Sequence, residues 1–102
     1  MDHKNHKFLS DQTVEEVART FKALADPTRV KIMYLLTQEE CSVGHIAEVL
    51  EMSQSAVSHQ LSYLRSLRLV KSRREGQSLI YTYDDEHVVE LLMQVIGHSL
   101  HE

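Results

Sequence analysis

Several residue types are rare in this sequence of 102 residues, which contains one cysteine, one proline, three glycines and no tryptophan. The single Cys41 excludes an internal disulfide, which agrees with a reducing compartment. No apolar run approaches the roughly 18 residues of a membrane span, and the polar start of the chain lacks the apolar segment of a signal peptide. We therefore expect a soluble, cytoplasmic single domain over residues 1–102 with no membrane partner.

Basic side chains are fewer than acidic ones, 11 against 15, and the formal net charge is −4. Its distribution is uneven, because residues 53–83 carry five Lys and Arg side chains against Glu75 alone, whereas residues 84–102 carry five carboxylates and no Lys or Arg. A local basic surface matters more for phosphate contact than the total charge does. The pattern predicts a middle segment that binds nucleic acid and a final segment that attracts cations.

Hydrophobic spacing predicts four helices after a polar, flexible arm at residues 1–10. The first helix has Asp11 or Thr13 as its cap, and Asp26 with Pro27 separates it from the second. Ser42 caps a short third helix, in which we expect these apolar side chains to be buried: Val43, Ile46, Ala47, Val49 and Leu50. Ser53 caps a fourth helix over residues 53–67, and about three residues join it to the third. Such a pair is typical of a helix-turn-helix with residues 53–67 as its recognition helix.

The period then changes to that of strands, and residues 70–83 predict a β-hairpin with its turn at Gly76-Gln77. A hairpin in this position is a wing. The side chains that we predict to contact double-stranded operator DNA are Gln54, Ser55, Ser58, His59, Tyr63 and Arg65 of the recognition helix and Arg73, Arg74 and Gln77 of the wing. The alternative is that the polar residues of the helix serve capping and solubility, and that the wing is a solvated basic edge.

The last segment, residues 85–101, predicts an amphipathic helix for dimerisation and metal binding. At about 100° per residue, His98 and His101 lie within about 20° and 40° of His87 around the helix axis. Asp85, as part of the N-cap, can turn back toward His87. The four predicted metal ligands are therefore Asp85, His87, His98 and His101.

One chain cannot close this site, because a rise of about 1.5 Å per residue separates His87 from His98 by roughly 16 Å. Two helices packed antiparallel across a two-fold axis would bring Asp85 and His87 of one chain to His98 and His101 of the other. Three nitrogens and one oxygen suit tetrahedral Zn(II) or Co(II). The alternative is that these are solvated surface histidines on a terminal helix.

The order of elements and several segments of the chain closely resemble the ArsR/SmtB family of bacterial metal-responsive repressors, from Val14 to His101. The segments that carry the resemblance are residues 21–29, 53–61, 67–70 and 74–81. The resemblance implies a mainly α fold with a β-hairpin, a winged helix-turn-helix, as a homodimer. The spacing of the four ligands looks like the C-terminal-helix site of the CzrA-type zinc/cobalt repressors.

Members of that family that sense cadmium, lead or arsenic use cysteines in the third helix. Here the two corresponding positions are Ser42 and Gly44, and Cys41 lies one residue early. The sequence therefore departs from the thiolate pattern. A second site drawn from Cys41, His45, His3 or His6 stays an alternative.

We thus expect that the metal-free homodimer binds a two-fold-symmetric operator and represses metal-efflux genes. Binding of Zn(II) or Co(II) is then expected to release the homodimer from the operator. One alternative is a winged-helix repressor that responds to Ni(II), to redox state or to no ligand. The other is a small metalloenzyme, but that requires an open coordination position and a general base in a cleft, and neither is evident. The sequence has no nucleophile–base pair, glycine-rich phosphate loop or HExxH motif, so we expect a protein that is not an enzyme.

Overall fold

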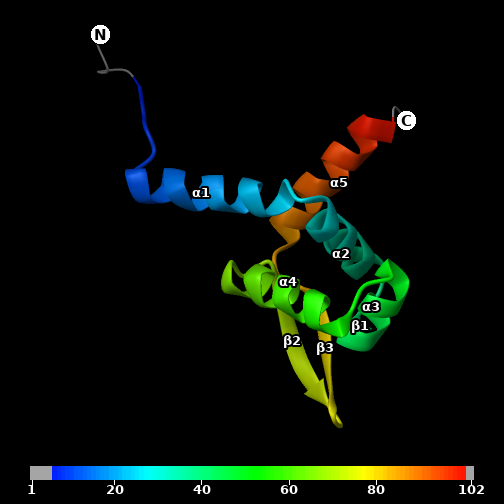
Figure 1. Cartoon of the computed structure of the whole chain (residues 1–102). Coiled ribbons are helices and arrows are strands. Elements are labelled where there is room, and N and C mark those ends of the chain that lie inside the picture. The colour runs from blue at the N-terminus through cyan, green and yellow to red at the C-terminus, as the bar shows by residue number, and fades with distance from the viewer. Residues whose placement is uncertain (1–5, 101–102) are drawn as a thin grey trace.

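The structure is a computed structural model, and it describes residues 6–100. Five helices and three short strands follow one another along this part of the chain (Figure 1). In chain order they are α1 (Asp11–Leu24), α2 (Pro27–Gln38), β1 (Cys41–Ser42), α3 (Val43–Leu50), α4 (Gln54–Ser66), β2 (Val70–Glu75), β3 (Ser78–Tyr83) and α5 (Glu86–Leu100).

Side-chain caps fix where the first four helices begin. The side chains of Asp26, Ser42 and Ser53 accept hydrogen bonds from backbone N–H groups in the first turns of α2, α3 and α4, at 3.1 Å each. In α1 the cap is Ser10, whose Oγ accepts from Thr13 N at 3.2 Å, and not Asp11 or Thr13 as the sequence predicts. Each cap satisfies an N–H that the helix itself leaves unpaired.

The sheet has three antiparallel strands in the order β1-β3-β2. The predicted hairpin is confirmed: β2 and β3 pair from Val70 with Tyr83 to Glu75 with Ser78, and Gly76 in the turn has a φ of +63°. The third strand is an addition, in which Cys41 pairs with Tyr81 and Ser42 with Ile80. A strand of two residues is too short to show an alternating pattern in the sequence.

The core lies between α2, α3, α4 and the base of the sheet. Ile32, Ile46 and Leu61 are completely buried there, and Leu92 of α5 closes one side. Val49, which we expected in the core, is instead exposed on the outer face of α3. The buried residues come from all five helices and all three strands, so the wing and the helix-turn-helix share one hydrophobic core.

Helices α1 and α5 extend from the core, while the wing points away from both of them (Figure 1). Each contributes one buried residue, Ala23 in α1 and Leu92 in α5. Their apolar faces border a shared hollow, and Phe21 and Val95 on its rim are 54% and 53% exposed. An apolar surface of this kind is unusual on a monomer and favours an interface with another chain.

Candidate DNA-binding face and metal-binding residues

The turn between α3 and α4 has the geometry that a helix-turn-helix requires. Glu51 adopts the left-handed conformation with a φ of 56°, and its N–H ends α3. Met52 N donates to Ala47 O at 2.9 Å, and Ser53 caps α4 immediately afterwards. The chain therefore passes from α3 to α4 within three residues, from 51 to 53, and α4 begins with its first side chains on the surface.

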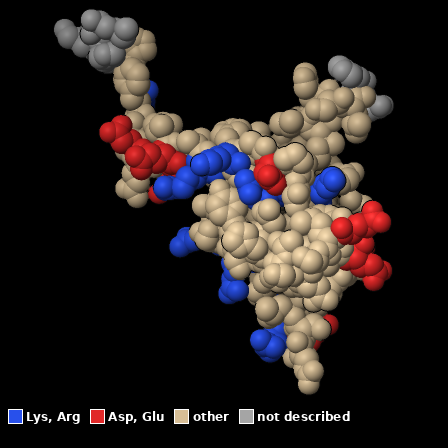
Figure 2. Space-filling view, viewed as in Figure 1, with Lys and Arg blue, Asp and Glu red and all other residues tan. Residues whose placement is uncertain are grey.

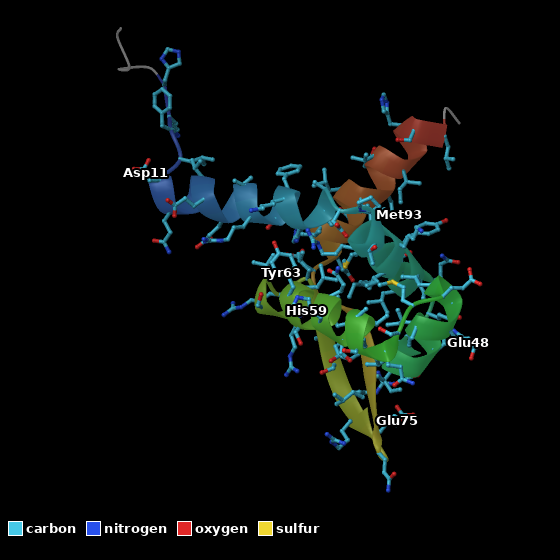
Figure 3. The ribbon with its side chains drawn as sticks, viewed as in Figure 1. Asp11, Glu48, His59, Tyr63, Glu75 and Met93 are labelled. Carbon is cyan, nitrogen blue, oxygen red and sulfur yellow. The ribbon has the colours of Figure 1, made fainter. Side chains whose placement is uncertain are left out.

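The outer face of α4 carries most of the predicted DNA-binding residues. Figure 3 shows two of them, His59 and Tyr63, along this helix. The exposed residues of the predicted set in α4 are Gln54, Ser55, Ser58, His59 and Arg65. Short polar side chains in the first turns of a helix suit contact with base edges, and Arg65 near its end suits contact with phosphate.

Tyr63 differs from the others because it is half-buried and packs under Arg29 of α2. The guanidinium carbon of Arg29 lies 4.6 Å from the centre of the Tyr63 ring, a cation–π contact. The same guanidinium donates to Gln60 Oε1 at 3.3 Å and to Ala23 O at 2.8 Å. Arg29 therefore joins α4 to the corner between α1 and α2. The sequence alone does not predict this role, although Arg29 lies in residues 21–29, one of the segments that carry the family resemblance.

Charge is distributed unevenly around the wing and α3. Figure 2 shows Lys and Arg side chains over the later part of α1 and down the side that leads to the wing, whereas Asp and Glu side chains gather at the start of α1 and beside α3. In the wing, Arg73 pairs with Glu40 at 2.8 Å and with Glu75 at 2.9 Å. The hydrogen bond from Arg73 holds the pKa of Glu40 below its usual range. Arg74 and Gln77 are exposed, and no carboxylate in the described residues forms an ion pair with Arg74.

The first turn of α5 brings two of the predicted metal ligands together. Asp85 Oδ1 accepts from the backbone N–H of His87 at 2.8 Å and of Val88 at 3.4 Å, and it lies 3.2 Å from His87 Nδ1. Partial burial opposes ionisation of Asp85, but these hydrogen bonds lower its pKa overall. The result is an ionised carboxylate beside an imidazole that is 97% exposed.

Of the other two predicted ligands, one lies toward the opposite end of α5. His98 is exposed in the last turns of the helix, and His101 lies outside the described residues. The helical rise separates His87 from His98 by roughly 16 Å, so a single chain does not bring these two histidines together. The residues fit a metal with nitrogen and oxygen ligands only if a second chain contributes half of the site.

A second group of possible metal ligands lies where β1 meets α3. Among the described residues, Glu39, Cys41 and His45 each place one ligand atom within 4.8 Å of the others. Burial, reinforced by the Glu39 carboxylate, raises the pKa of the Cys41 thiol to about 11. The sequence reasoning considered Cys41 and His45 but missed Glu39. The signal that could have found it is a carboxylate two residues before the cysteine, at the end of a helix.

No helix in the described part of the chain has both the length and the apolar character needed to cross a membrane. Residues 26–72, which contain α2, α3, α4 and the start of β2, match the bacterial regulatory protein arsR family. This match covers the helix-turn-helix and the residues that position it.

The chain is similar to known regulators over most of its length. It is 43% identical over 90 residues to a transcriptional repressor SmtB homolog from Synechocystis sp., covering 88% of this chain and 68% of the relative. It is 43% identical over 94 residues to a cadmium resistance transcriptional regulatory protein CadC homolog from Staphylococcus aureus, covering 91% and 78%.

The fold is likewise similar to solved structures. The homodimeric winged helix-turn-helix DNA-binding domain of Mb0332 from Mycobacterium bovis has a TM-score of 0.81 and 35% identity, covering 91% of this chain and 89% of that domain. The architecture predicted from the sequence is therefore confirmed. The chain belongs to the arsR family of bacterial regulatory proteins, the ArsR/SmtB family that its sequence resembles, and is a transcriptional regulator and not an enzyme.

Proposed function

We propose that the chain is a metal-responsive transcriptional repressor that acts in the cytoplasm as a homodimer. The metal-free dimer binds a two-fold-symmetric DNA operator, and Zn(II) or Co(II) at α5 lowers its affinity for that DNA. The observation that carries the proposal is the pairing of Asp85 and His87 at the start of α5, with His98 near its end. Each end is half of a site, and an antiparallel partner helix supplies the other half.

The dimer is supported by the exposed apolar faces of α1 and α5. Phe21, Val95 and Leu100 are large apolar side chains that the single chain leaves more than half exposed. Burying such side chains against a second copy is worth about 1.5–3 kcal/mol each when burial is complete. The similar Mb0332 domain is itself described as homodimeric. We infer that α5 and α1 pack against the same helices of the partner.

The DNA-binding role is supported by the positions of α4 and the wing. Residues Gln54, Ser55 and Ser58 lie on the open face of α4, at the start of the helix. Dimeric helix-turn-helix proteins place two such helices one DNA turn apart, about 34–36 Å, so a symmetric operator follows from a symmetric dimer. In this proposal His59, Tyr63 and Arg65 lie nearer the phosphates, and Arg73, Arg74 and Gln77 of the wing contact the adjacent groove or backbone.

Metal specificity follows from the donor atoms in the proposed site. Asp85, His87, His98 and His101 offer three imidazoles and one carboxylate, a set that suits tetrahedral zinc or cobalt as in CzrA-type repressors. Soft cations prefer thiolates, and this set contains none. A metal that weakens DNA binding must itself bind the DNA complex more weakly by the same factor. Fixing the two α5 helices to each other would fix the spacing of the two α4 helices, which is one way to lower DNA affinity.

The test is a zinc titration of the dimer bound to a fluorescent DNA duplex, selected from random sequence by the metal-free protein. Fluorescence anisotropy should fall as zinc releases the parent protein. His98→Ala should bind DNA as the parent does and stay bound when zinc is added. His6→Ala is the matched control, because it removes a histidine outside the proposed site, and it should respond like the parent.

Two outcomes would overturn the proposal. Release of His98→Ala by zinc at the same concentration as the parent would show that the signal enters elsewhere. A Ni(II) response that needs His6, with a weakly absorbing octahedral Co(II) complex, would favour a nickel sensor with more than four ligands. Strong visible absorption of the Co(II) complex supports the tetrahedral site.

A further inference from the structure

The junction between α2, β1 and α3 holds three side chains of the types that bind soft or borderline cations. Glu39 follows the last residue of α2, Cys41 begins β1 and His45 lies in the first turn of α3. His45 Nε2 is 2.6 Å from Glu39 Oε1, and Cys41 Sγ is 3.5 Å from the same oxygen. The proposed ligands of α5 include no sulfur, so this cluster has a different donor chemistry.

The burial of the three side chains suits a cation that enters from solvent. Cys41 is 1% exposed and forms the inner end of the cluster, whereas the side chains of His45 and Glu39 are 46% and 51% exposed. A thiolate at the base, with an imidazole and a carboxylate at the mouth, leaves a fourth position for water. Three protein ligands and a water form a common zinc coordination.

The distances within the cluster can be compared with those of a tetrahedral site. Bond lengths of about 2.3 Å for Zn–S and about 2.0–2.1 Å for Zn–O and Zn–N place sulfur about 3.5 Å from oxygen and nitrogen about 3.3 Å from oxygen. The observed sulfur–oxygen distance is already 3.5 Å. The nitrogen–oxygen distance must open from 2.6 Å. Bonds to the cation would then replace the direct hydrogen bond between His45 and Glu39. Because both side chains are exposed, this is a small rearrangement.

We propose that Glu39, Cys41 and His45 form a second metal site, for a thiophilic divalent cation such as Cd(II) or Zn(II), at the junction of α2, β1 and α3. Binding forms a metal–sulfur bond and releases the thiol proton to solvent. The cadmium-type family pattern does not supply this site, because its two cysteine positions are Ser42 and Gly44 in this sequence.

The position of the cluster connects it to the DNA-binding elements. Cys41 pairs with Tyr81 of β3, and Glu40, between two of the ligands, binds Arg73 of the wing. Ser42 caps α3, whose first turn carries His45. A cation held by residues 39, 41 and 45 would therefore hold the start of the helix-turn-helix against the base of the wing.

The experiment uses His98→Ala protein, which lacks the proposed α5 site, and titrates it with Cd(II) while thiolate-to-metal charge-transfer absorption is recorded in the ultraviolet. Because the α5 ligands contain no sulfur, this absorption reports only on Cys41. We expect a band that saturates at one Cd(II) per chain. Failure of the α5 proposal would leave this result unchanged, so the two proposals are tested separately.

Variants at the exposed ligands show whether the band comes from the whole cluster. Glu39→Gln and His45→Ala should each lower Cd(II) affinity at least tenfold, since even outer partners of metal ligands cost about 10–100-fold when removed. Glu48→Gln, an exposed carboxylate of α3 outside the cluster, is the matched control and should keep the parent affinity. Cys41→Ser should abolish the band, and circular dichroism checks that it still folds.

The proposal is wrong if no charge-transfer band appears in the folded parent or in His98→Ala. It is also wrong if Glu39→Gln and His45→Ala bind Cd(II) as tightly as their control, because that result would leave Cys41 as a lone thiol that reacts with cadmium by itself.

Discussion

Substitution of Asp85 separates two roles that one carboxylate combines. Its Oδ1 accepts the hydrogen bonds that cap α5, from His87 N at 2.8 Å and Val88 N at 3.4 Å, and it is also a proposed metal ligand. Asp85→Ala removes the cap, which costs about 1 kcal/mol within a range of about 0.5–2. Asp85→Asn keeps an oxygen that can accept both bonds, so we expect a loss of only a few tenths of a kcal/mol, from the weaker interaction with the helix dipole.

In the absence of metal, about 1 kcal/mol corresponds to a fall of about 4–8 °C in the midpoint of thermal unfolding for a chain of this size. We therefore expect the Ala variant to unfold at a lower temperature than the parent and the Asn variant to unfold close to the parent. Zinc at about 100 times its Kd should stabilise the parent by about 2.7 kcal/mol. Both variants lack the ionised carboxylate, and each tenfold loss of zinc affinity removes about 1.4 kcal/mol of that gain.

The assay is thermal unfolding followed by circular dichroism at one fixed protein concentration, with and without zinc, because the stability of a dimer depends on concentration. Two results would refute the reasoning. If Asp85→Asn gained as much stability from zinc as the parent, Asp85 would not be a ligand. If Asp85→Ala were as stable as the parent without metal, the observed hydrogen bonds would not be capping α5.

Three further predictions concern charge, thiol chemistry and assembly. Arg74→Ala should reduce the magnitude of the slope of log DNA affinity against log salt concentration by about 1. Arg73→Ala should reduce it less, because Glu40 and Glu75 already pair with Arg73. Equal reductions in the two variants would contradict this reasoning. Cys41 of the metal-free protein has a pKa of about 11, against 9.0 for an ordinary thiol, so it should react with iodoacetamide at pH 8 far more slowly than Cys41 of the unfolded chain does. The free energy of unfolding should also fall as pH rises from 9 to 11, because the thiol of the unfolded chain loses its proton first. In analytical ultracentrifugation, Val95→Glu should convert the dimer to a monomer, whereas Val49→Glu, an exposed change on α3, should leave the protein dimeric. If both variants were dimeric, the assignment of α5 to the interface would be refuted.

Local sequence chemistry was sufficient to predict most of the fold. Ser42 and Ser53 mark helix starts because their short side chains accept from the first free N–H groups, and Gly76 marks the hairpin because its φ of +63° favours glycine. The prediction failed where tertiary contacts decide. Val49 has the spacing of a core residue, yet it lies beside α2 at the edge of an open hollow and stays 49% exposed.

The candidate sites divide in the same way. The pairing of Asp85 with His87 could be predicted, because the two residues are adjacent to a helix cap. The sequence signals Glu39 only as a carboxylate two residues before Cys41, because the approach of its side chain to His45 depends on how the chain turns from α2 through β1 into α3. Arg29 is similar: its contact with Tyr63 joins residues that are distant in the sequence. Helical period carries no information about such contacts.

The wing lies between the two candidate metal sites along the chain and is attached to both. At one end, Glu40 binds Arg73 of β2 at 2.8 Å. At the other, Asp84 N donates to Leu69 O at 3.0 Å, one residue before Asp85 begins the cap of α5. A shift in the first turn of α5 therefore acts on the base of the wing through two residues of backbone. Coupling free energies between sites are typically about 1–3 kcal/mol, and rearranging a few hydrogen bonds of about 0.5–1.5 kcal/mol each would be enough to supply them. The base of the wing, and not its tip, is thus where substitutions should change the metal response while the DNA-free protein keeps its metal affinity and the metal-free protein keeps its DNA affinity.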